Sequence, residues 1–379
     1  MTIVFTGGGT GGHFYPIIAI SEAIQDLVRE KHLIAPKLYF LAPAPFDQNA
    51  LFENGIGYIH TPAGKMRRYF SLRNITDFFV TLAGTFSALV TLYRLYPDVV
   101  VSKGGYASVP AVFAAWLLRI PVIIHESDAK PGRANLFAAK FAKKIAISFD
   151  SAAAFFPKKV QNRIALTGIP IRKALMRVET EGANQYLTLE PEVPTVFILG
   201  GSQGAQRINE VVLSALPDLV RISNVIHQTG RANFKNVQGI SQVILAKEVH
   251  ANRYHPVDYL SEISMQRAAG VASIIVSRAG ANALAEIGLW KRPAIIIPIP
   301  ESVSHDQHSN AYSYARTGAG VVLEEANLTP HVLVSEIQRI TSDKALSAKM
   351  AAAAEGFTNP DAAKILAEQV LALALSHEL

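Results

Sequence analysis

Short apolar runs alternate with longer segments of helical periodicity along the whole chain. In the first half, the runs that predict strands lie at residues 3–6, 38–42, 57–60, 98–102, 122–125 and 144–148. The second half repeats this order, with strands predicted at residues 195–199, 224–227, 242–246, 273–277, 294–298 and 320–323. Strands that alternate with helices are typical of βαβ units and parallel sheets. We therefore predict an α/β fold with two successive, Rossmann-like parallel-sheet domains.

The join between these domains is predicted near Thr167-Gly-Ile-Pro170, after the last strand of the first half. A chain of 379 residues is long enough for two domains with separate cores. We expect one domain at residues 1–168 and the other at 169–359, with a final helix in 360–379 that crosses back to the first. Facing one another, the two would form a cleft at the carboxyl ends of their strands, where such folds bind ligands.

One predicted helix, at residues 78–93, carries no charged residue. A helix that spans a membrane needs about 20 apolar residues, so this one is expected not to span. It is either a core helix or a surface helix that offers aromatic side chains to a bilayer. The basic residues just before it favour the second interpretation, because phospholipid headgroups are anionic. The candidate membrane-facing residues are Phe78, Phe79, Leu82, Phe86, Arg67 and Arg68.

Composition narrows the classes of partner. The chain has no cysteine, which excludes disulfides and thiolate metal sites, and its net charge of +6 favours anionic partners. No run of five like charges and no basic stripe occurs, so nucleic acid is not expected. The adjacent residues His305-Asp-Gln-His308 lack the spacing of metal ligands, and we predict no metal. The first residues have no basic segment of the kind that opens a signal peptide.

The first strand runs directly into Thr6-Gly-Gly-Gly-Thr-Gly-Gly-His13. Glycines between a strand and a helix expose backbone N–H groups that bind phosphate. A Walker A loop would have lysine where His13 stands, and a dinucleotide loop would need an acid near the end of the second strand, which ends at Ala42 without one. The motif therefore predicts a phosphate-binding loop that carries an imidazole. His13 is either a polar helix-opening residue or a general base.

Three further segments follow predicted strands in the same way. Gly200-Gly-Ser202 and Gly280 each open a helix, and Glu286 lies in the second of these helices, where it could accept two ribose hydroxyls. Ser202 could instead cap its helix, and Glu286 could be an exposed surface residue. His125-Glu-Ser-Asp128 ends a strand, where functional residues gather, or forms a solvated loop with a structural His–Glu hydrogen bond.

Together these motifs resemble those of the MurG-type N-acetylglucosaminyltransferases. The matching segments are Gly8-Gly-Thr-Gly-Gly-His13, Gly104-Gly-Tyr-Ala-Ser-Val-Pro110, His125-Glu126, Gly200-Gly-Ser-Gln-Gly-Ala205, Ser277-Arg-Ala-Gly280 and Glu286. The resemblance implies a GT-B fold and a peripheral enzyme on the cytoplasmic face of the cell membrane. It implies transfer of N-acetylglucosamine from UDP-N-acetylglucosamine to the 4-hydroxyl of MurNAc in undecaprenyl-pyrophosphoryl-MurNAc-pentapeptide, with inversion and without metal or other cofactor.

The resemblance also implies roles for single residues. His13 is the candidate base, and Glu126 and Asp128 are further candidates. Many family members have His-Glu-Gln-Asn where this chain has His125-Glu-Ser-Asp128, so an aspartate stands here in place of an asparagine that contacts the donor in those members. A second departure is Ala279, where serine is common. The residues expected to bind the donor or a diphosphate are Thr10, Gly11, Gly12, Arg172, Ser202, Leu260, Glu286 and Gln307.

Other interpretations remain open at the level of sequence. Another GT-B enzyme, such as a UDP-sugar epimerase or a glycolipid-forming glycosyltransferase, would share the donor loops. A nicotinamide-dependent oxidoreductase is suggested only by Gly7, Gly9 and Gly12. A non-enzymatic protein of the lipid surface would leave three glycine-to-helix openings unexplained. The sequence leaves the oligomeric state and the stem peptide of the acceptor undetermined.

Overall fold

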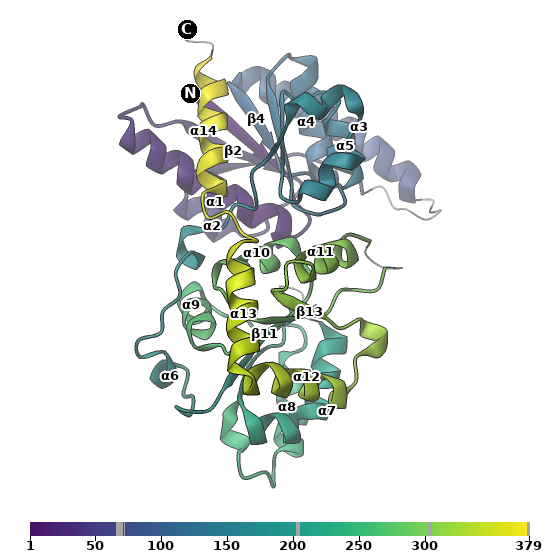
Figure 1. The fold of residues 1–379 in the computed structure, drawn as a ribbon. Coiled ribbons are helices and arrows are strands. Elements are labelled where there is room, and N and C mark those ends of the chain that lie inside the picture. The colour runs from purple at the N-terminus through teal and green to yellow at the C-terminus, as the bar shows by residue number, and fades with distance from the viewer. Residues whose placement is uncertain (66–70, 72, 202–204, 302–304, 377–379) are drawn as a thin grey trace. The chain divides into compact units, whose positions relative to one another are not determined.

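The computed structural model describes residues 1–65, 71, 73–201, 205–301 and 305–376. The chain divides into two units, one formed by Met1–Arg172 with Asn359–Leu379 and the other by Lys173–Thr358. This division lies four residues after the first boundary expected from sequence and one residue before the second. Each unit is an α/β sandwich with its own parallel sheet (Figure 1).

The sheet of the first unit has seven parallel strands in the order β3-β2-β1-β4-β5-β6-β7. The strand order reverses between β1 and β4, which are hydrogen-bonded neighbours, with Val4 opposite Val100. A crevice opens at the carboxyl ends of strands at such a reversal, and it is the usual ligand site of open α/β sheets. The strands are β1 (Thr2–Thr6), β2 (Lys37–Ala42), β3 (Ile56–His60), β4 (Val99–Ser102), β5 (Val122–Glu126), β6 (Lys144–Ile147) and β7 (Ile164–Leu166).

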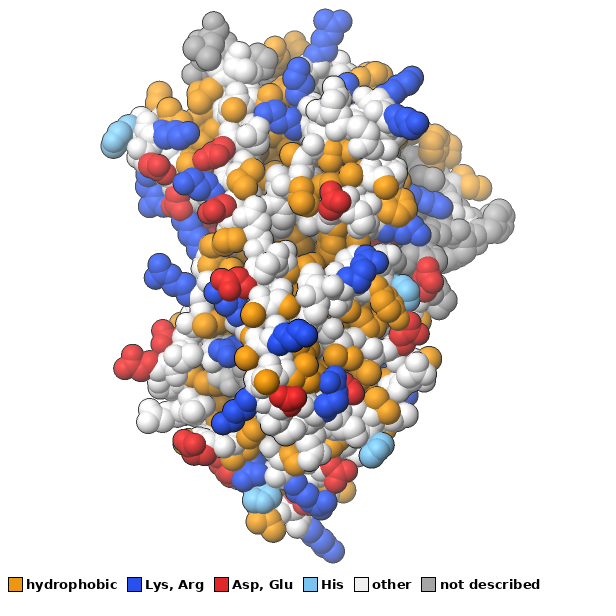
Figure 2. Space-filling model, viewed as in Figure 1, with side chains coloured by type: hydrophobic (Ala, Val, Ile, Leu, Met, Phe, Trp, Pro, Cys, Tyr) orange, Lys and Arg blue, Asp and Glu red, His pale blue; other side chains and the backbone are white. Residues whose placement is uncertain are grey.

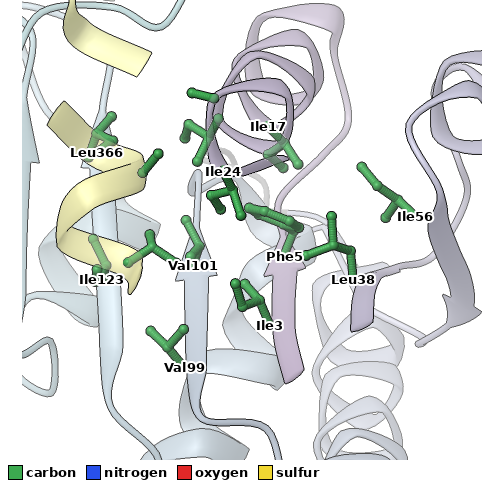
Figure 3. Close-up of a cluster of buried hydrophobic side chains, with 14 of the residues drawn as sticks. Ile3, Phe5, Ile17, Ile24, Leu38, Ile56, Val99, Val101, Ile123 and Leu366 are labelled. Carbon is green, nitrogen blue, oxygen red and sulfur yellow. The ribbon is translucent and has the colours of Figure 1, made fainter. Parts of the chain in front are cut away.

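Helices cover both faces of this sheet. On one face, Ile24 of α1 and Leu366 of α14 pack over Phe5 and Val101, so the C-terminal helix closes the core of the first unit (Figure 3). On the other face, α3, α4 and α5 cover the opposite side of the same strands. The helices are α1 (Gly11–Glu30), α2 (Gln48–Glu53), α3 (Arg73–Leu95), α4 (Val109–Leu117), α5 (Arg133–Ala138) and α14 (Ala362–Leu375).

The second unit has a six-stranded parallel sheet in the order β10-β9-β8-β11-β12-β13. Its strands are β8 (Thr195–Leu199), β9 (Asn224–Gln228), β10 (Tyr254–Val257), β11 (Ile274–Ser277), β12 (Ala294–Ile296) and β13 (Gly320–Val322). Its helices are α6 (Ala183–Tyr186), α7 (Gln206–Ile222), α8 (Phe234–Ile244), α9 (Glu262–Val271), α10 (Ala281–Leu289), α11 (His305–Ala315), α12 (Pro330–Ser342) and α13 (Lys344–Glu355). The order reverses between β8 and β11, so this unit has the same kind of crevice as the first.

The strand predicted at residues 242–246 is wrong. These residues end helix α8, and the edge strand is β10, which pairs with β9 through Tyr254 and Val225. The apolar run Val243-Ile-Leu245 suggested a strand, but Val243 is 78% exposed while Leu245 is buried, as on a helix with one apolar face. Short apolar runs do not distinguish a strand from the end of an amphipathic helix.

Helix α3 is longer than the sequence suggested. It has 23 residues, and among the described residues it is the helix that is long and apolar enough to cross a membrane by length and composition. The predicted length of this helix, residues 78–93, is therefore wrong, whereas the expectation that it does not span a membrane stays a prediction. Its residues Gly84, Ala88 and Leu92 are buried against the first unit, and a Cβ on Gly84 would meet the carbonyl oxygen of Pro62 at 1.8 Å. The helix therefore lies along the surface of the unit with one narrow face packed.

The opposite face of α3 is apolar and exposed. Phe79 is 64% exposed and Phe86 is 70% exposed, whereas a core helix would bury them. Phe78, Leu82 and Tyr93 are exposed in the same way. The preceding residues Arg67 and Arg68 lie outside the described residues. On the molecular face in Figure 2, the described basic and acidic side chains are interspersed and form no continuous basic stripe.

Candidate active site

Two glycine loops meet at the carboxyl ends of β1 and β4. The first joins β1 to α1, and the second follows Lys103 at the end of β4. Gly105 adopts a φ of +76°, and a Cβ there would lie 2.7 Å from the carbonyl oxygen of Gly8. Only glycine tolerates both this conformation and this approach. The loops therefore pack backbone to backbone and leave the N-terminus of α1 open toward the crevice.

His13 lies in the first turn of α1. Its Nδ1 is 3.0 Å from the hydroxyl oxygen of Thr10, the residue that precedes the helix. Burial of the half-buried ring, followed by the positive charge of Lys103, lowers the pKa of His13 to about 4. The imidazole is therefore neutral at pH 7. When Thr10 accepts the Nδ1 proton, Nε2 carries the lone pair that a general base needs.

His125, the fourth residue of β5, is completely buried. Its Nδ1 lies 2.6 Å from the ammonium of Lys103, and its Nε2 lies 2.8 Å from the carbonyl oxygen of Gly168. The ring therefore donates from Nε2 to Gly168 and accepts at Nδ1. Burial, then the charge of Lys103, holds the pKa of His125 well below its usual range. A neutral histidine with both nitrogens engaged serves the structure rather than the chemistry.

Glu126 ends β5 and turns its carboxylate into its own loop. It accepts hydrogen bonds from the backbone N–H groups of Asp128 and Gly132, at 2.9 and 3.0 Å, and from Nδ2 of Asn135 at 2.9 Å. Burial, followed by the nearby Asp128, raises the pKa of Glu126. The carboxylate therefore holds the loop together, while the half-buried Asp128 is the acid of this segment that reaches solvent.

Arg172 is the last residue of the first part of unit one. Its guanidinium lies over the ring of Tyr15, 4.0 Å from the ring centre, and the Tyr15 hydroxyl donates to Asp47 at 3.4 Å. Tyr15 follows His13 by two residues on α1. The structure thus brings Arg172 to the helix that the first glycine loop opens, although the two segments are far apart in sequence.

The predicted donor residues of the second unit follow three different strands of its sheet, with Leu260 after β10, Glu286 after β11 and Gln307 after β12. Glu286 lies on α10, which begins immediately after the loop that follows β11. The side-chain oxygen of Gln307 on α11 accepts from the N–H of Ile299 at 3.3 Å. Leu260 is 5% exposed and packs in the core, so only its backbone could face a ligand. Ser202 lies outside the described residues.

His308 is the histidine of the segment 305–308 whose side chain the structure describes. His308 stacks on Tyr312 and lies 3.4 Å from a carboxylate oxygen of Glu324. Among the described residues, no three His, Asp or Glu side chains come together in a way that could hold a metal ion.

Sequence reasoning missed three residues of the candidate site in the first unit, namely Lys103, Asn135 and Tyr15. Each looks ordinary in sequence, because a lysine after a strand is usually solvated and an asparagine or tyrosine on a helix is usually at the surface. The only signal for Lys103 was its position between a buried strand and a glycine pair, at the end of the sheet where functional residues gather.

Comparison with known proteins decides the family. The glycosyltransferase family 28 N-terminal domain matches residues 3–147, and the glycosyltransferase family 28 C-terminal domain matches residues 195–366. The chain belongs to glycosyltransferase family 28. Both of its halves match in the order expected for the two α/β units, so the prediction of an enzyme that transfers sugars is confirmed.

Close relatives narrow the family further. The chain is 36% identical over 344 residues to a protein of Bacillus anthracis, covering 89% of this chain and 91% of that one. It is 32% identical over 360 residues to one of Treponema denticola, covering 91% and 89%. Both are named UDP-N-acetylglucosamine–N-acetylmuramyl-(pentapeptide) pyrophosphoryl-undecaprenol N-acetylglucosamine transferases. The resemblance to MurG-type enzymes is therefore confirmed.

Solved structures agree with this fold. The crystal structure of Acinetobacter baumannii MurG matches with a TM-score of 0.74 and 25% identity, covering 98% of this chain and 99% of that chain. A UDP-GlcNAc 2-epimerase from Neisseria meningitidis, bound to UDP-GlcNAc, matches with a TM-score of 0.67 and 14% identity, covering 98% and 100%. The second likeness speaks for the fold alone. The two parallel-sheet domains are those of a GT-B protein.

Proposed function

We propose that this glycosyltransferase transfers N-acetylglucosamine from UDP-N-acetylglucosamine to the 4-hydroxyl of MurNAc in undecaprenyl-pyrophosphoryl-MurNAc-pentapeptide, a step of peptidoglycan synthesis. The observation that carries the proposal is that relatives with this named activity align with about nine tenths of the chain at 32–36% identity. The first unit would bind the acceptor and the second the UDP-sugar.

His13 is the proposed general base. It would take the proton of the acceptor 4-hydroxyl while that oxygen attacks the anomeric carbon on the face opposite the UDP group. The bond to the UDP oxygen breaks as the new glycosidic bond forms, so the configuration inverts. The neutral state of His13 and its place at the open end of α1 support this role. Asp128 is the second candidate, since it is only half-buried and lies near Lys103, as His13 does.

Charge on the leaving diphosphate would be offset by backbone N–H groups and by an arginine. Thr10, Gly11 and Gly12 form the start of α1, where orphan N–H groups and the helix dipole favour an anion. Arg172 lies beside the same helix through its contact with Tyr15. These groups act as preorganised donors for a developing negative charge, so the proposed reaction needs no metal ion.

The second unit would recognise the rest of the donor. Glu286 would accept the ribose hydroxyls, Gln307 would bind the sugar, Leu260 would present its backbone near uracil, and Ser202 would meet the diphosphate. Support comes from the positions of Glu286 and Gln307 on α10 and α11, the helices that follow β11 and β12, and from the helix that opens after Gly280.

Membrane attachment is proposed through the exposed apolar face of α3. Phe78, Phe79, Leu82 and Phe86 are more than half exposed, and an amphipathic helix with such a face lies in the interface of a bilayer. Arg67 and Arg68, just before it, would meet anionic headgroups. Because the other face of α3 packs on the first unit, we propose a peripheral protein on the cytoplasmic face of the membrane.

The test is acceptor-dependent release of UDP. UDP-N-acetylglucosamine is incubated with the protein and a lipid-linked MurNAc-pentapeptide analogue in EDTA, and UDP and the disaccharide product are measured. Release that requires acceptor and yields the disaccharide is expected. Release without acceptor would point to an epimerase or a hydrolase, and UDP binding without release would refute the proposed acceptor.

A further inference from the structure

Lys103 is a buried lysine in the candidate site of the first unit. Only 2% of the residue is exposed, and its backbone N–H donates to the carbonyl oxygen of Thr6 at the end of β1. A Cβ on Gly7 would lie 2.8 Å from the Cβ of Lys103, so the first glycine loop passes directly over the lysine. An ammonium group is rarely buried to this extent unless partners compensate its charge.

The ammonium group holds the turn that follows β5. It donates to Nδ1 of His125 at 2.6 Å and to the hydroxyl oxygen of Ser127. These two residues flank Glu126, whose carboxylate in turn binds the N–H of Asp128. Through these bonds Lys103 determines the path of the chain up to Asp128, although Lys103 is 22 residues from His125 and 24 residues from Ser127 in the sequence.

Four titratable groups face this lysine. Glu126 and Asp128 belong to the loop after β5, His125 to β5 itself, and His13 to α1. Burial lowers the pKa of Lys103, while the charges of Glu126 and Asp128 act in the opposite direction. Because both histidines are neutral at pH 7, Lys103 is the cation that balances two neighbouring carboxyl groups.

We infer that Lys103 is a positioning residue whose buried ammonium orders the His125–Asp128 turn and supplies positive charge beside the carboxyl groups of Glu126 and Asp128. The serine of this turn fits such a role, because the Ser127 hydroxyl accepts a hydrogen bond from the ammonium. The catalytic part of the inference rests on the proposed transfer reaction, whereas the charge balance does not.

The charge balance is tested by a double-mutant cycle on thermal stability. Lys103→Met removes the cation, Asp128→Asn removes one carboxylate, and the double variant removes both. We expect Lys103→Met to lower the unfolding midpoint by about 5–10 °C, and the double variant to recover part of that loss. Lys158→Met, which alters an exposed lysine of the same unit, should leave the midpoint unchanged.

The double-mutant cycle supports the inference if the double variant recovers stability and refutes it if the double variant does not. If Lys103→Met does not fold, recovery of a folded double variant supports charge compensation, and failure of the double variant to fold refutes it. Strictly additive losses refute it as well, because they would assign the lysine a packing role alone. None of these readouts depends on transferase activity, so a failure of the proposed function would not be mistaken for a failure here.

The positioning role is tested by the pH profile of transfer. In Lys103→Met we expect kcat to fall about 10- to 100-fold with little change in KM for UDP-N-acetylglucosamine, and the acid limb to move to higher pH. The limb moves because the proposed base His13 loses the positive charge of Lys103, which lowers the pKa of the His13 imidazole. Ser127→Ala, which keeps the charge, should lower kcat without moving the limb. An unmoved limb in Lys103→Met would overturn this role.

Discussion

The variant Glu126→Gln tests whether the carboxylate of Glu126 has a structural or a catalytic role. In the folded protein the two carboxylate oxygens accept from three donors, the N–H groups of Asp128 and Gly132 and the amide of Asn135. Glutamine keeps the size of the side chain but offers one acceptor oxygen and an NH₂ group. One of the two acceptor positions therefore becomes a donor that points at another donor.

The expected loss of stability follows from the number of buried donors left without an acceptor. In the best orientation the glutamine oxygen keeps the Gly132 and Asn135 bonds, and its NH₂ group faces the N–H of Asp128. Loss of one buried hydrogen bond with an unsatisfied donor left behind costs about 1–3 kcal/mol in the free energy of unfolding. Glu126→Ala leaves all three donors without an acceptor and should cost about 3–5 kcal/mol. Such losses are large against a typical stability of roughly 5–15 kcal/mol.

Urea unfolding and amide hydrogen exchange measure these effects. Glu126→Gln should lower the unfolding free energy and speed exchange at the Asp128 and Gly132 amides, with transferase activity falling in parallel. Glu30→Gln on the exposed end of α1 is the matched control and should change stability by less than about 0.5 kcal/mol. A Glu126→Gln variant with wild-type stability and slow exchange but lost transfer would refute the reasoning, because the carboxylate would then act in the chemistry.

Three further predictions follow from the site and the surface. His13→Ala should lower kcat by about 10²–10⁴-fold with UDP binding kept, and near-wild-type turnover would move the base elsewhere. The double replacement Phe79→Ser and Phe86→Ser should reduce flotation with anionic vesicles about tenfold or more, while Phe52→Ser, which alters an exposed phenylalanine of α2, should not; equal effects would argue against a specific membrane face. His227 is fully buried with its pKa lowered to about 3, so only the unfolded state takes up its proton as pH falls below 6.5. The free energy of unfolding should therefore drop by about 2 kcal/mol per such histidine between pH 6.5 and 5. If the free energy of unfolding of His227→Gln depended on pH as in the wild type, this prediction would be contradicted.

The sequence by itself determined the α/β class, the two sheets and the positions of most strands. Strands of a parallel sheet are covered on both faces, so they appear as continuous apolar runs such as residues 99–101 and 122–124. It also determined where the chemistry lies, because a glycine loop between a strand and a helix always opens at the carboxyl end of the sheet. His13 could be singled out for this reason.

Only the tertiary structure decided which side chains share an environment. The periodicity of α3 identified an apolar face, but the face packed on the first unit is formed by Gly84, Ala88 and Leu92, and the phenylalanines are exposed. Glu126 belonged to a promising motif, yet its carboxylate turns into its own loop. The position of Lys103 after a buried strand was its only signal, because its partners His125 and Ser127 come from the end of the next strand of the sheet and the turn after it. Hydrophobic patterns record which positions are apolar, whereas burial of a charge depends on groups that only folding brings together.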